Sequence, residues 1–359
     1  MDIIIYGIGT NCEKVIKKIK KYSNFKLLGL ADSYKNENQW GIPMIDVEVC
    51  VEEYKNVPIV ISIRNPQRIL QVYYKLKSLG YMNIYRFLDK DYCWNSDFFQ
   101  GNCVKLENIG KCWLPRLEMH AANHCNLNCK GCSHFSPLFD DILPDYAQCM
   151  SDIKRLKGLI EGALDFNLLG GEPLLNPNLS DYVIGIRENL SITAIYVITN
   201  GLLIPKLDED TLRCFHNNNV IVFVSEYEPT RRIIDKIKMK LEDFQVDYII
   251  NSNKDKFRKP LTLSEHDIDM QECPAPTCVN VGNGKIARCP MILYADKLKT
   301  RFGLEITGGG VFDLDDFKDG FDLKNRLMRE FPLCRHCVKN EVVWSQCGRE
   351  IKVEDFVEL

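Results

Sequence analysis

Three cysteines fall within eight residues of the chain, at Cys125, Cys129 and Cys132, in the spacing C-x3-C-x2-C. This spacing lets one short loop wrap three thiolates around a single metal centre. An iron–sulfur cluster is the sharper interpretation, because three protein thiolates leave one iron open to bind a substrate or cofactor. A tetrahedral zinc site would need a fourth ligand, and His124 and His134 flank the loop. Three reduced core thiols are the other alternative, although Asn, Lys, His and Gly neighbours would make a poor core.

The motif resembles that of the radical SAM enzymes, whose cysteines lie in a loop after the first strand of a partial (β/α) barrel. The resemblance implies that Cys125, Cys129 and Cys132 hold a [4Fe–4S] cluster. It also implies that S-adenosylmethionine (SAM) chelates the fourth iron and is cleaved by one electron to methionine and a 5′-deoxyadenosyl radical, which abstracts a substrate hydrogen. The residue before the third cysteine is usually aromatic in this family. Here it is Gly131, and Phe135 is the candidate to replace its contact with adenine.

Strand and helix signals alternate from residue 114 to about 252 and predict the partial (β/α)6 radical SAM barrel, assigned to 114–265. The expected strands are 116–121, 166–169, 194–198, 220–224 and 246–250, with a helix over 145–160 and an apolar helical stripe from Ile233 to Phe244. Each of the second, third and fourth strands ends in a polar motif. Chemistry in (β/α) barrels lies at the carboxyl ends of the strands, so these motifs and the cysteine loop should line one mouth.

The resemblance gives these polar residues roles in binding SAM. The backbone of Gly170 and Gly171 would approach the methionyl part, and Glu172 or neighbouring backbone would accept a hydrogen bond from the ammonium group. Asn200 and Ser225 match positions that usually contact SAM. An ordinary turn at Gly-Gly-Glu and a satisfied strand-end hydroxyl at Ser225 are the alternatives.

Six further cysteines lie between residues 273 and 347: Cys273, Cys278, Cys289, Cys334, Cys337 and Cys347. Zinc would be the default metal for a C-x2-C pair with distant cysteines. Beside the central motif, the pattern resembles the SPASM and Twitch extensions of radical SAM enzymes, which hold auxiliary [4Fe–4S] clusters. The resemblance predicts one auxiliary cluster in a small cysteine-rich domain, 266–359, held by Cys289, Cys334 and Cys337 with Cys278 or Cys273 as fourth ligand. An Asn-Gly turn predicts a hairpin that brings Cys278 and Cys289 towards one another.

Residues 1–92 alternate strand and helix signals and predict a Rossmann-like domain of the nucleotide-binding type, followed by a linker at 93–113. Gly7 and Gly9 form half of the dinucleotide fingerprint, with Cys12 in place of the third glycine. Asp32 ends the second strand, where an acid can accept a ribose hydroxyl. A mononucleotide or nucleotide-sugar is therefore the expected ligand, and a scaffold with an empty crevice is the alternative.

Composition narrows the class of protein. The 359 residues carry 46 basic and 49 acidic side chains, so no basic excess points to nucleic acid. No apolar run approaches the roughly 18 residues of a membrane span, and the N-terminus reads as a strand, not a signal peptide. The sequence therefore predicts a cytoplasmic protein, in which 16 cysteines are metal ligands more readily than disulfides.

These features predict a radical SAM oxidoreductase or epimerase. An auxiliary cluster that accepts an electron would favour oxidation, and a thiol that returns a hydrogen would favour epimerisation. The N-terminal domain favours a sugar or glycan substrate over a ribosomal peptide, because it does not resemble the winged-helix element that recognises peptides. The family resemblance implies a reductant such as flavodoxin or ferredoxin. A non-catalytic iron–sulfur regulator is the remaining alternative, and the sequence singles out no catalytic residue.

Overall fold

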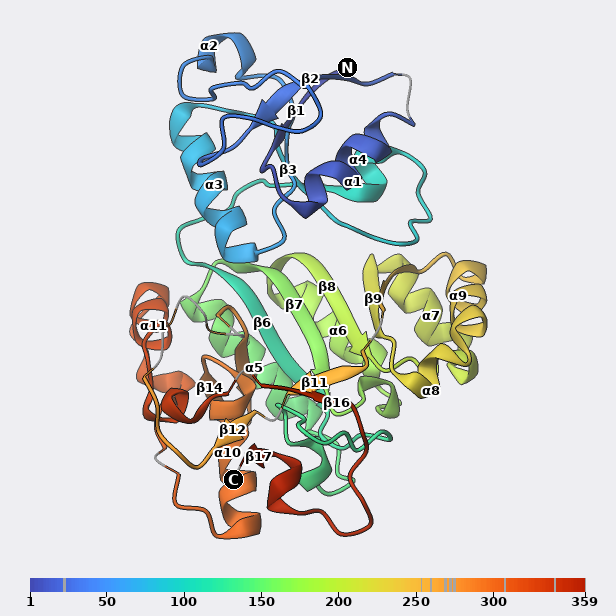
Figure 1. The fold of residues 1–359 in the computed structure, drawn as a ribbon, viewed down its shortest axis with the longest axis vertical. Helices are drawn as coiled ribbons and strands as arrows, with labels where there is room; N and C mark the ends of the chain where they lie inside the picture. The colour runs from blue at the N-terminus through green and yellow to red at the C-terminus, as the bar shows by residue number, and fades with distance from the viewer. Residues whose placement is uncertain are drawn as a thin grey trace. The chain divides into compact units, whose positions relative to one another are not determined.

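A computed structural model describes residues 1–21, 24–252, 254–258, 260–267, 270, 273, 276–306, 308–338 and 340–358. The chain divides into two compact units, Met1–Ile109 and Gly110–Leu359 (Figure 1). The first unit is built on a five-stranded sheet and the second on an eight-stranded sheet, so each has a core of its own. None of the helices in the described ranges is both long and apolar enough to cross a membrane.

The first unit alternates strands and helices. Its elements are β1 (Asp2–Tyr6), α1 (Thr10–Ile19), β2 (Lys26–Ala31), α2 (Val51–Tyr54), β3 (Ile59–Ile61), α3 (Pro66–Leu79), β4 (Ile84–Phe87), α4 (Phe98–Asn102) and β5 (Cys103–Lys105). The sheet order is β2-β1-β3-β4-β5, with β1 to β4 parallel and β5 antiparallel. The predicted parallel sheet is therefore present, and α3 has the predicted bounds because Asn65 caps its start and Gly80 ends it in a left-handed conformation.

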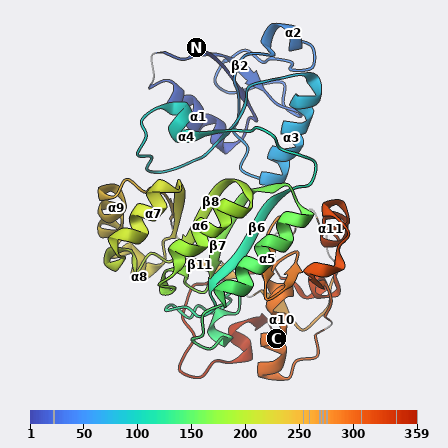
Figure 2. The ribbon, with the colours of Figure 1, turned by 180° about the vertical axis from the view of Figure 1, so that it is seen from behind.

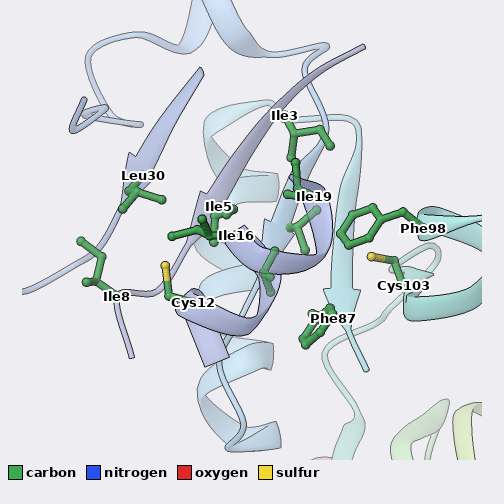
Figure 3. Close-up of a cluster of buried hydrophobic side chains, with 12 residues drawn as sticks. Ile3, Ile5, Ile8, Cys12, Ile16, Ile19, Leu30, Phe87, Phe98 and Cys103 are labelled. Carbon is green, nitrogen blue, oxygen red and sulfur yellow. The ribbon is translucent and has the colours of Figure 1, made fainter. Parts of the chain in front are cut away.

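The core of the first unit comes from two sequence periodicities. Ile3 and Ile5 alternate along β1 and point into one cluster, which α1 covers with its apolar stripe (Figure 3). Cys12 is fully buried in this cluster. The position of the missing third glycine is therefore a packing position on the buried face of α1.

The predicted linker at 93–113 differs from the structure. Residues 98–105 form α4 and β5, and β5 pairs with β4 at the edge of the first sheet. Phe98 is fully buried, with its ring centroid 5.7 Å from that of Phe25 and 5.2 Å from that of Phe99. These aromatic side chains belong to the first core, so the first unit extends to Ile109.

The second unit begins with four strand–helix repeats. Its elements are β6 (Trp113–Ala122), η1 (Ser136–Leu138), α5 (Tyr146–Leu159), β7 (Gly162–Gly170), η2 (Pro173–Leu175), α6 (Leu179–Asn189), β8 (Ser191–Thr199), η3 (Ile204–Lys206), α7 (Glu209–Asn217), β9 (Val220–Ser225), α8 (Glu228–Arg231), α9 (Ile234–Asp243) and β10 (Asp247–Asn251). Each predicted strand is present, and most of the observed strands are longer than the apolar run in the sequence that predicted them. α5 and α6 cover one face of β6, β7 and β8 (Figures 1 and 2).

The C-terminal segments are short. They are β11 (Lys256–Arg258), β12 (Leu261–Thr262), β13 (Val279–Gly282), β14 (Lys285–Ala287), α10 (Pro290–Phe302), β15 (Val311–Asp313), η5 (Leu314–Asp316), α11 (Gly320–Leu327), η6 (Pro332–His336), β16 (Glu341–Val343), η7 (Val353–Asp355) and β17 (Val357–Glu358). The predicted hairpin joins β13 to β14, and its two turn residues, Asn283 and Gly284, both have positive φ.

The large sheet crosses the predicted boundary at residue 265. Its order is β10-β9-β8-β7-β6-β13-β14-β15, and β13 pairs in parallel with β6. The strands from β10 to β13 in this order are therefore parallel neighbours, as a sequence of βα repeats requires. The cysteine-rich part shares this sheet, because the backbone groups on the open edge of β6 take β13 as their partner.

Candidate functional site

The Gly-Gly-Glu turn after β7 fixes the start of the cysteine loop. The N–H of Gly171 donates to the carbonyl of Ala122 at 2.8 Å, and the N–H of Glu172 donates to the carbonyl of His124 at 2.9 Å. Gly170 has a φ of 124°, which side chains rarely allow. A Cβ at Gly171 would overlap the carbonyl of His124. Both glycines are therefore required by the close approach of two backbones.

Glu172 ties the end of β7 to the end of β8. Its carboxylate is fully buried and accepts hydrogen bonds from the N–H of Leu174 (3.1 Å), the N–H of Asn200 (2.8 Å) and the hydroxyl of Thr199 (2.6 Å). Burial raises its pKa to about 7, although these three hydrogen bonds oppose the rise. The carboxylate therefore accepts hydrogen bonds from three groups of its own chain.

Asn200 lies beside the cysteine loop, as its position after β8 predicts. Its side-chain amide donates to Asn126 Oδ1 at 2.7 Å and lies 3.9 Å from Cys125 Sγ. Its own Oδ1 accepts from the N–H of Leu202 at 3.0 Å, which fixes the orientation of the amide. Ser225 ends the next strand and is partly exposed.

The three cysteines of the loop are free thiols that lie close enough to affect one another electrostatically. Burial raises the pKa of Cys125 and Cys129 to about 12, and Cys132 contributes to both increases. Without a nearby cation these sites favour the protonated thiol, and a bound metal would supply the missing charge. Within the described ranges, no group of three or more His, Cys, Asp or Glu side chains is already arranged to hold a metal ion.

A C-terminal segment, residues 344–355, packs on the cysteine loop. Trp344 Nε1 donates to Cys129 Sγ at 3.1 Å across 215 positions of sequence, and the N–H of Cys347 donates to the carbonyl of Asn128 at 2.7 Å. The ring of Tyr227, after β9, lies 5.3 Å from that of Trp344. Burial raises the pKa of Tyr227, and the thiols of the loop add to this effect, so the phenol lies near them. Sequence reasoning missed both aromatic residues, because no local pattern links them to the loop.

The sequence suggests Phe135 as an adenine contact and His134 as a zinc ligand, and the structure engages both side chains elsewhere. Phe135 is fully buried and packs against Phe356 with ring centroids 5.8 Å apart, so it is a core residue and not a contact for adenine. The N–H of Gly131 donates to the carbonyl of Asp355 at 2.6 Å. His134 Nδ1 lies 2.8 Å from Nε2 of the buried His120. This pairing occupies His134, which weakens its case as a zinc ligand.

A second group of cysteines surrounds one small apolar cavity. Its lining includes Cys273, Cys289, Cys334 and Cys337, together with Leu261, Ile292 and Leu333. Cys289 precedes α10, Cys334 lies in η6 and Cys337 follows η6. Burial raises the pKa of Cys289 to about 12, and the other three thiols add to the rise. The structure therefore brings four of the predicted ligands together.

Cys278 is the predicted ligand that stands apart from this group. Arg116 Nη1 lies 3.9 Å from its sulfur, and the charges of Glu118 and Arg116 act on its pKa. The hairpin forms, but its two cysteines face different surroundings, because Cys278 lies beside β6 and Cys289 starts α10. The register of the hairpin, with Asn280 opposite Ala287, leads back to Cys278 and Cys289 at its open end, as expected, and of the two Cys289 lines the small cavity.

Of the predicted nucleotide-binding residues in the first unit, Asp32 and Gly7 have structural roles of their own, and Gly9 has none in the described part of the chain. Asp32 accepts from the N–H of Ile8 at 2.7 Å and the N–H of Tyr34 at 2.9 Å, so its carboxylate closes its own loop. Gly7 has a φ of 103°, and a Cβ there would lie 2.7 Å from Ile63 Cγ1, so the fold requires glycine. Gly9 has neither constraint.

No protein-family model and no curated protein sequence matches the chain. Among solved structures, it is similar to anSMEcpe with bound AdoMet, at 22% identity over 38% of this chain and 43% of that chain, with a TM-score of 0.32. BtrN in complex with AdoMet and 2-DOIA is similar at 17% identity over 63% of this chain and 93% of that chain, with a TM-score of 0.40. Streptococcus suis SuiB bound to S-adenosylmethionine is similar at 12% identity over 50% and 60%, with a TM-score of 0.30. The chain spans less than half the length of anSMEcpe.

Proposed function

We propose that the second unit is a radical SAM enzyme. The observation that carries the proposal is the loop of Cys125, Cys129 and Cys132, held where parallel strands end by the Gly-Gly-Glu turn and flanked by Asn200. Parallel strands converge at their carboxyl ends, where βα folds place their chemistry. Three thiols in one loop, with Cys129 buried and Cys125 and Cys132 partly exposed, suit a cluster with one open iron better than a closed mononuclear zinc site.

Cys125, Cys129 and Cys132 would hold the cluster. Thiolates of a four-iron cluster bind separate irons, so they need not converge on one point as the ligands of a single ion do. Such a cluster would supply the one-electron chemistry that cleaves SAM and starts hydrogen abstraction from the substrate.

The chain's own groups would tune and protect this site. The indole N–H of Trp344 donates to the sulfur of Cys129, and hydrogen bonds to cluster sulfurs are one of the levers on reduction potential. Segment 344–355 packs on the loop through backbone hydrogen bonds and would hold it in place around a cluster. Glu172 acts as a positioning residue, since it holds the N–H of Asn200 and the turn that carries the loop.

Cys273, Cys289, Cys334 and Cys337 are the proposed ligands of an auxiliary [4Fe–4S] cluster. All four line one cavity, whereas Cys278 is engaged with Arg116. A fully thiolate-ligated cluster has no open iron and suits electron transfer. This supports oxidation of the substrate radical over epimerisation.

The substrate proposed is a sugar or glycan intermediate, and a peptide or protein is the second candidate. The first unit contains a cavity lined by Lys35, Arg64, Arg68 and Lys75, and these cations support the sugar, since nucleotide-linked sugars are anionic. The one-electron step needs an external reductant, for which flavodoxin or ferredoxin is proposed.

The test is anaerobic purification of the full chain, followed by iron analysis and incubation with SAM and dithionite. Two clusters predict about eight iron atoms per chain and release of 5′-deoxyadenosine. Replacing Cys125, Cys129 and Cys132 by Ala should remove about four iron atoms and abolish the release. A matched triple variant of partly exposed cysteines outside both groups, at Cys50, Cys112 and Cys214, should change neither.

Two results would reject the proposal. One is continued cleavage of SAM by the variant that lacks the loop cysteines. The other is zinc in place of iron after anaerobic reconstitution. Full iron content without SAM cleavage would instead favour the non-catalytic iron–sulfur regulator.

A further inference from the structure

The first unit contains a cavity of about 550 Å³ at the carboxyl ends of β1, β2 and β3. The strand order β2-β1-β3 means that the chain leaves β1 towards β2 on one side and returns to β3 on the other. Open α/β sheets bind ligands in the crevice at such a switch point. The volume lies within the range of small-molecule sites, so the cavity can hold a ligand of nucleotide size.

Gly9 keeps one wall of the cavity open. Its backbone is extended, with φ −111°, and a Cβ built on it meets no atom within 4 Å among the described residues. Neither conformation nor packing therefore requires glycine at this position, in contrast to Gly7. Because Gly9 lines the cavity and immediately precedes α1, the missing side chain leaves the first turn of α1 accessible to a ligand.

Four cationic side chains and one carboxylate line the cavity. The cations are Lys35, Arg64, Arg68 and Lys75, and the carboxylate is Asp32. Asp32 is neutralised in part by three backbone N–H groups, from Ile8, Tyr34 and Lys35. The cavity therefore favours an anion.

The cations differ in how they are held. Lys75 pairs with Glu48 at 2.6 Å, Arg64 pairs with Asp89 at 3.2 Å, and Lys35 Nζ donates to the carbonyl of Ile8 at 3.0 Å. Arg68 is exposed and shares one face of α3 with Lys75, seven positions later. Arg68 is therefore the cation best placed to turn towards a ligand.

The start of α1 adds donors on the same wall. α3 begins at Asn65, whose side chain accepts from the N–H groups of Gln67 and Arg68. α1 has Gly9 as its N-cap residue, and within the described residues no side chain caps this helix. Backbone N–H groups at a helix start favour phosphate, which matches the charge of the lining.

One aromatic side chain stands at the cavity without cover. Tyr34 is 90% exposed, although its ring is large and apolar. An exposed ring beside an anion site can stack on the base of a ligand, while the cationic side chains bind the anionic part of the same ligand. A ligand that carries both a phosphate and a planar aromatic ring is a nucleotide.

We propose that this cavity binds a nucleoside diphosphate, either free or as the carrier of a sugar. The diphosphate lies against Gly9, the start of α1 and Arg68, and the base lies on Tyr34. This site goes beyond the proposed SAM chemistry, because it belongs to the other unit and shares no residue with the cysteine loop.

The test is isothermal titration calorimetry of the full chain with ADP, GDP, UDP, CDP, UDP-glucose and pyrophosphate. At least one nucleoside diphosphate should bind about tenfold more tightly than pyrophosphate, because only the nucleotide also contacts Tyr34. Tighter binding of UDP-glucose than UDP would identify the sugar-linked form, and equal binding would identify the free nucleotide. No binding by any nucleotide, or equal binding by pyrophosphate, would overturn the proposal.

Two variants locate the site. Gly9→Val should fold normally, since its Cβ meets open space, and should lose nucleotide binding. Arg68→Gln should weaken binding by about tenfold, because a charge-assisted contact is lost. Lys77→Gln, an exposed charge on α3 outside the cavity, is the matched control and should leave affinity unchanged. Unchanged affinity in both Gly9→Val and Arg68→Gln would exclude this cavity.

The same titration separates this inference from the proposed function. The variant with Ala at Cys125, Cys129 and Cys132 should bind the nucleotide as tightly as the unmodified chain. Loss of binding in that variant would contradict an independent site in the first unit.

Discussion

Glu172 is a buried charge with a clear structural role. Its carboxylate is fully buried and joins two strand ends by accepting hydrogen bonds from Leu174, Thr199 and Asn200. Burial raises its pKa from 4.5 to about 7. The folded chain therefore binds this proton more tightly than the unfolded chain, which links the stability of the second unit to pH.

The raised pKa of Glu172 determines whether the stability of the second unit rises or falls with pH. Between pH 4.5 and 7 the folded state holds more protons at Glu172 than the unfolded state, so stability falls as pH rises through this window. The full difference corresponds to about 3 kcal/mol. In Glu172→Gln, whose side chain does not titrate, unfolding followed by calorimetry from pH 5 to 8 should show a smaller decline.

Glu188→Gln is the control for this measurement. Glu188 is exposed on α6, so its removal should leave the pH dependence as it is in the unmodified chain. An equal decline in the Glu172→Gln variant and the unmodified chain would show that Glu172 does not cause it.

The position of these polar residues could be predicted from the sequence, but the direction of their side chains could not. Glu172 and Asp32 both follow strands, as a polar residue after an apolar run indicates. Both then accept several hydrogen bonds from their own backbone. A strand-end carboxylate that meets its own loop and one that meets a ligand have the same sequence signal.

At the scale of elements, the turn after β7 and the cysteine loop form one unit of backbone. Gly171 lies so close to His124 that a Cβ would overlap its carbonyl. Gly171→Ala should therefore shift the loop, destabilise the second unit by roughly 2 kcal/mol or more, and reduce the iron retained after anaerobic purification. Calorimetry and iron analysis give the two readouts.

Gly158→Ala is the matched substitution. Gly158 is exposed in α5, and a Cβ there meets nothing within 4 Å among the described residues. Alanine should stabilise this helix by about 0.5–1 kcal/mol and leave iron content unchanged. If Gly171→Ala behaves like Gly158→Ala, the close approach does not control the loop.

The elements that the sequence could not place are those paired over long distances. The βα repeats and the hairpin turn at Asn283 and Gly284 are local patterns, and they were predicted. The parallel pairing of β13 with β6 and the bond between Trp344 and Cys129 join parts of the chain more than 150 positions apart. No local periodicity carries such information, so the shared sheet and the covered loop emerge only from the structure.

At the scale of the whole molecule, the division at Ile109 makes a prediction about independent folding. The first unit includes α4 and β5, and Phe98 lies fully buried in its core. A fragment of residues 1–109 should therefore unfold in a single cooperative transition. The boundary expected from the sequence, at residue 92, would remove both elements.

A fragment of residues 1–92 should be much less stable than one of residues 1–109. It loses the buried ring of Phe98, worth about 3 kcal/mol, and leaves the edge of β4 unpaired. A loss of this size lowers the melting temperature of a small domain by more than about 10 °C. Thermal unfolding followed by circular dichroism compares the two fragments directly. A fragment of residues 1–113 should have the same melting temperature as the fragment of residues 1–109. Equal melting temperatures for 1–92 and 1–109 would show that the first core closes without α4 and β5, and that the chain beyond residue 92 is a linker after all.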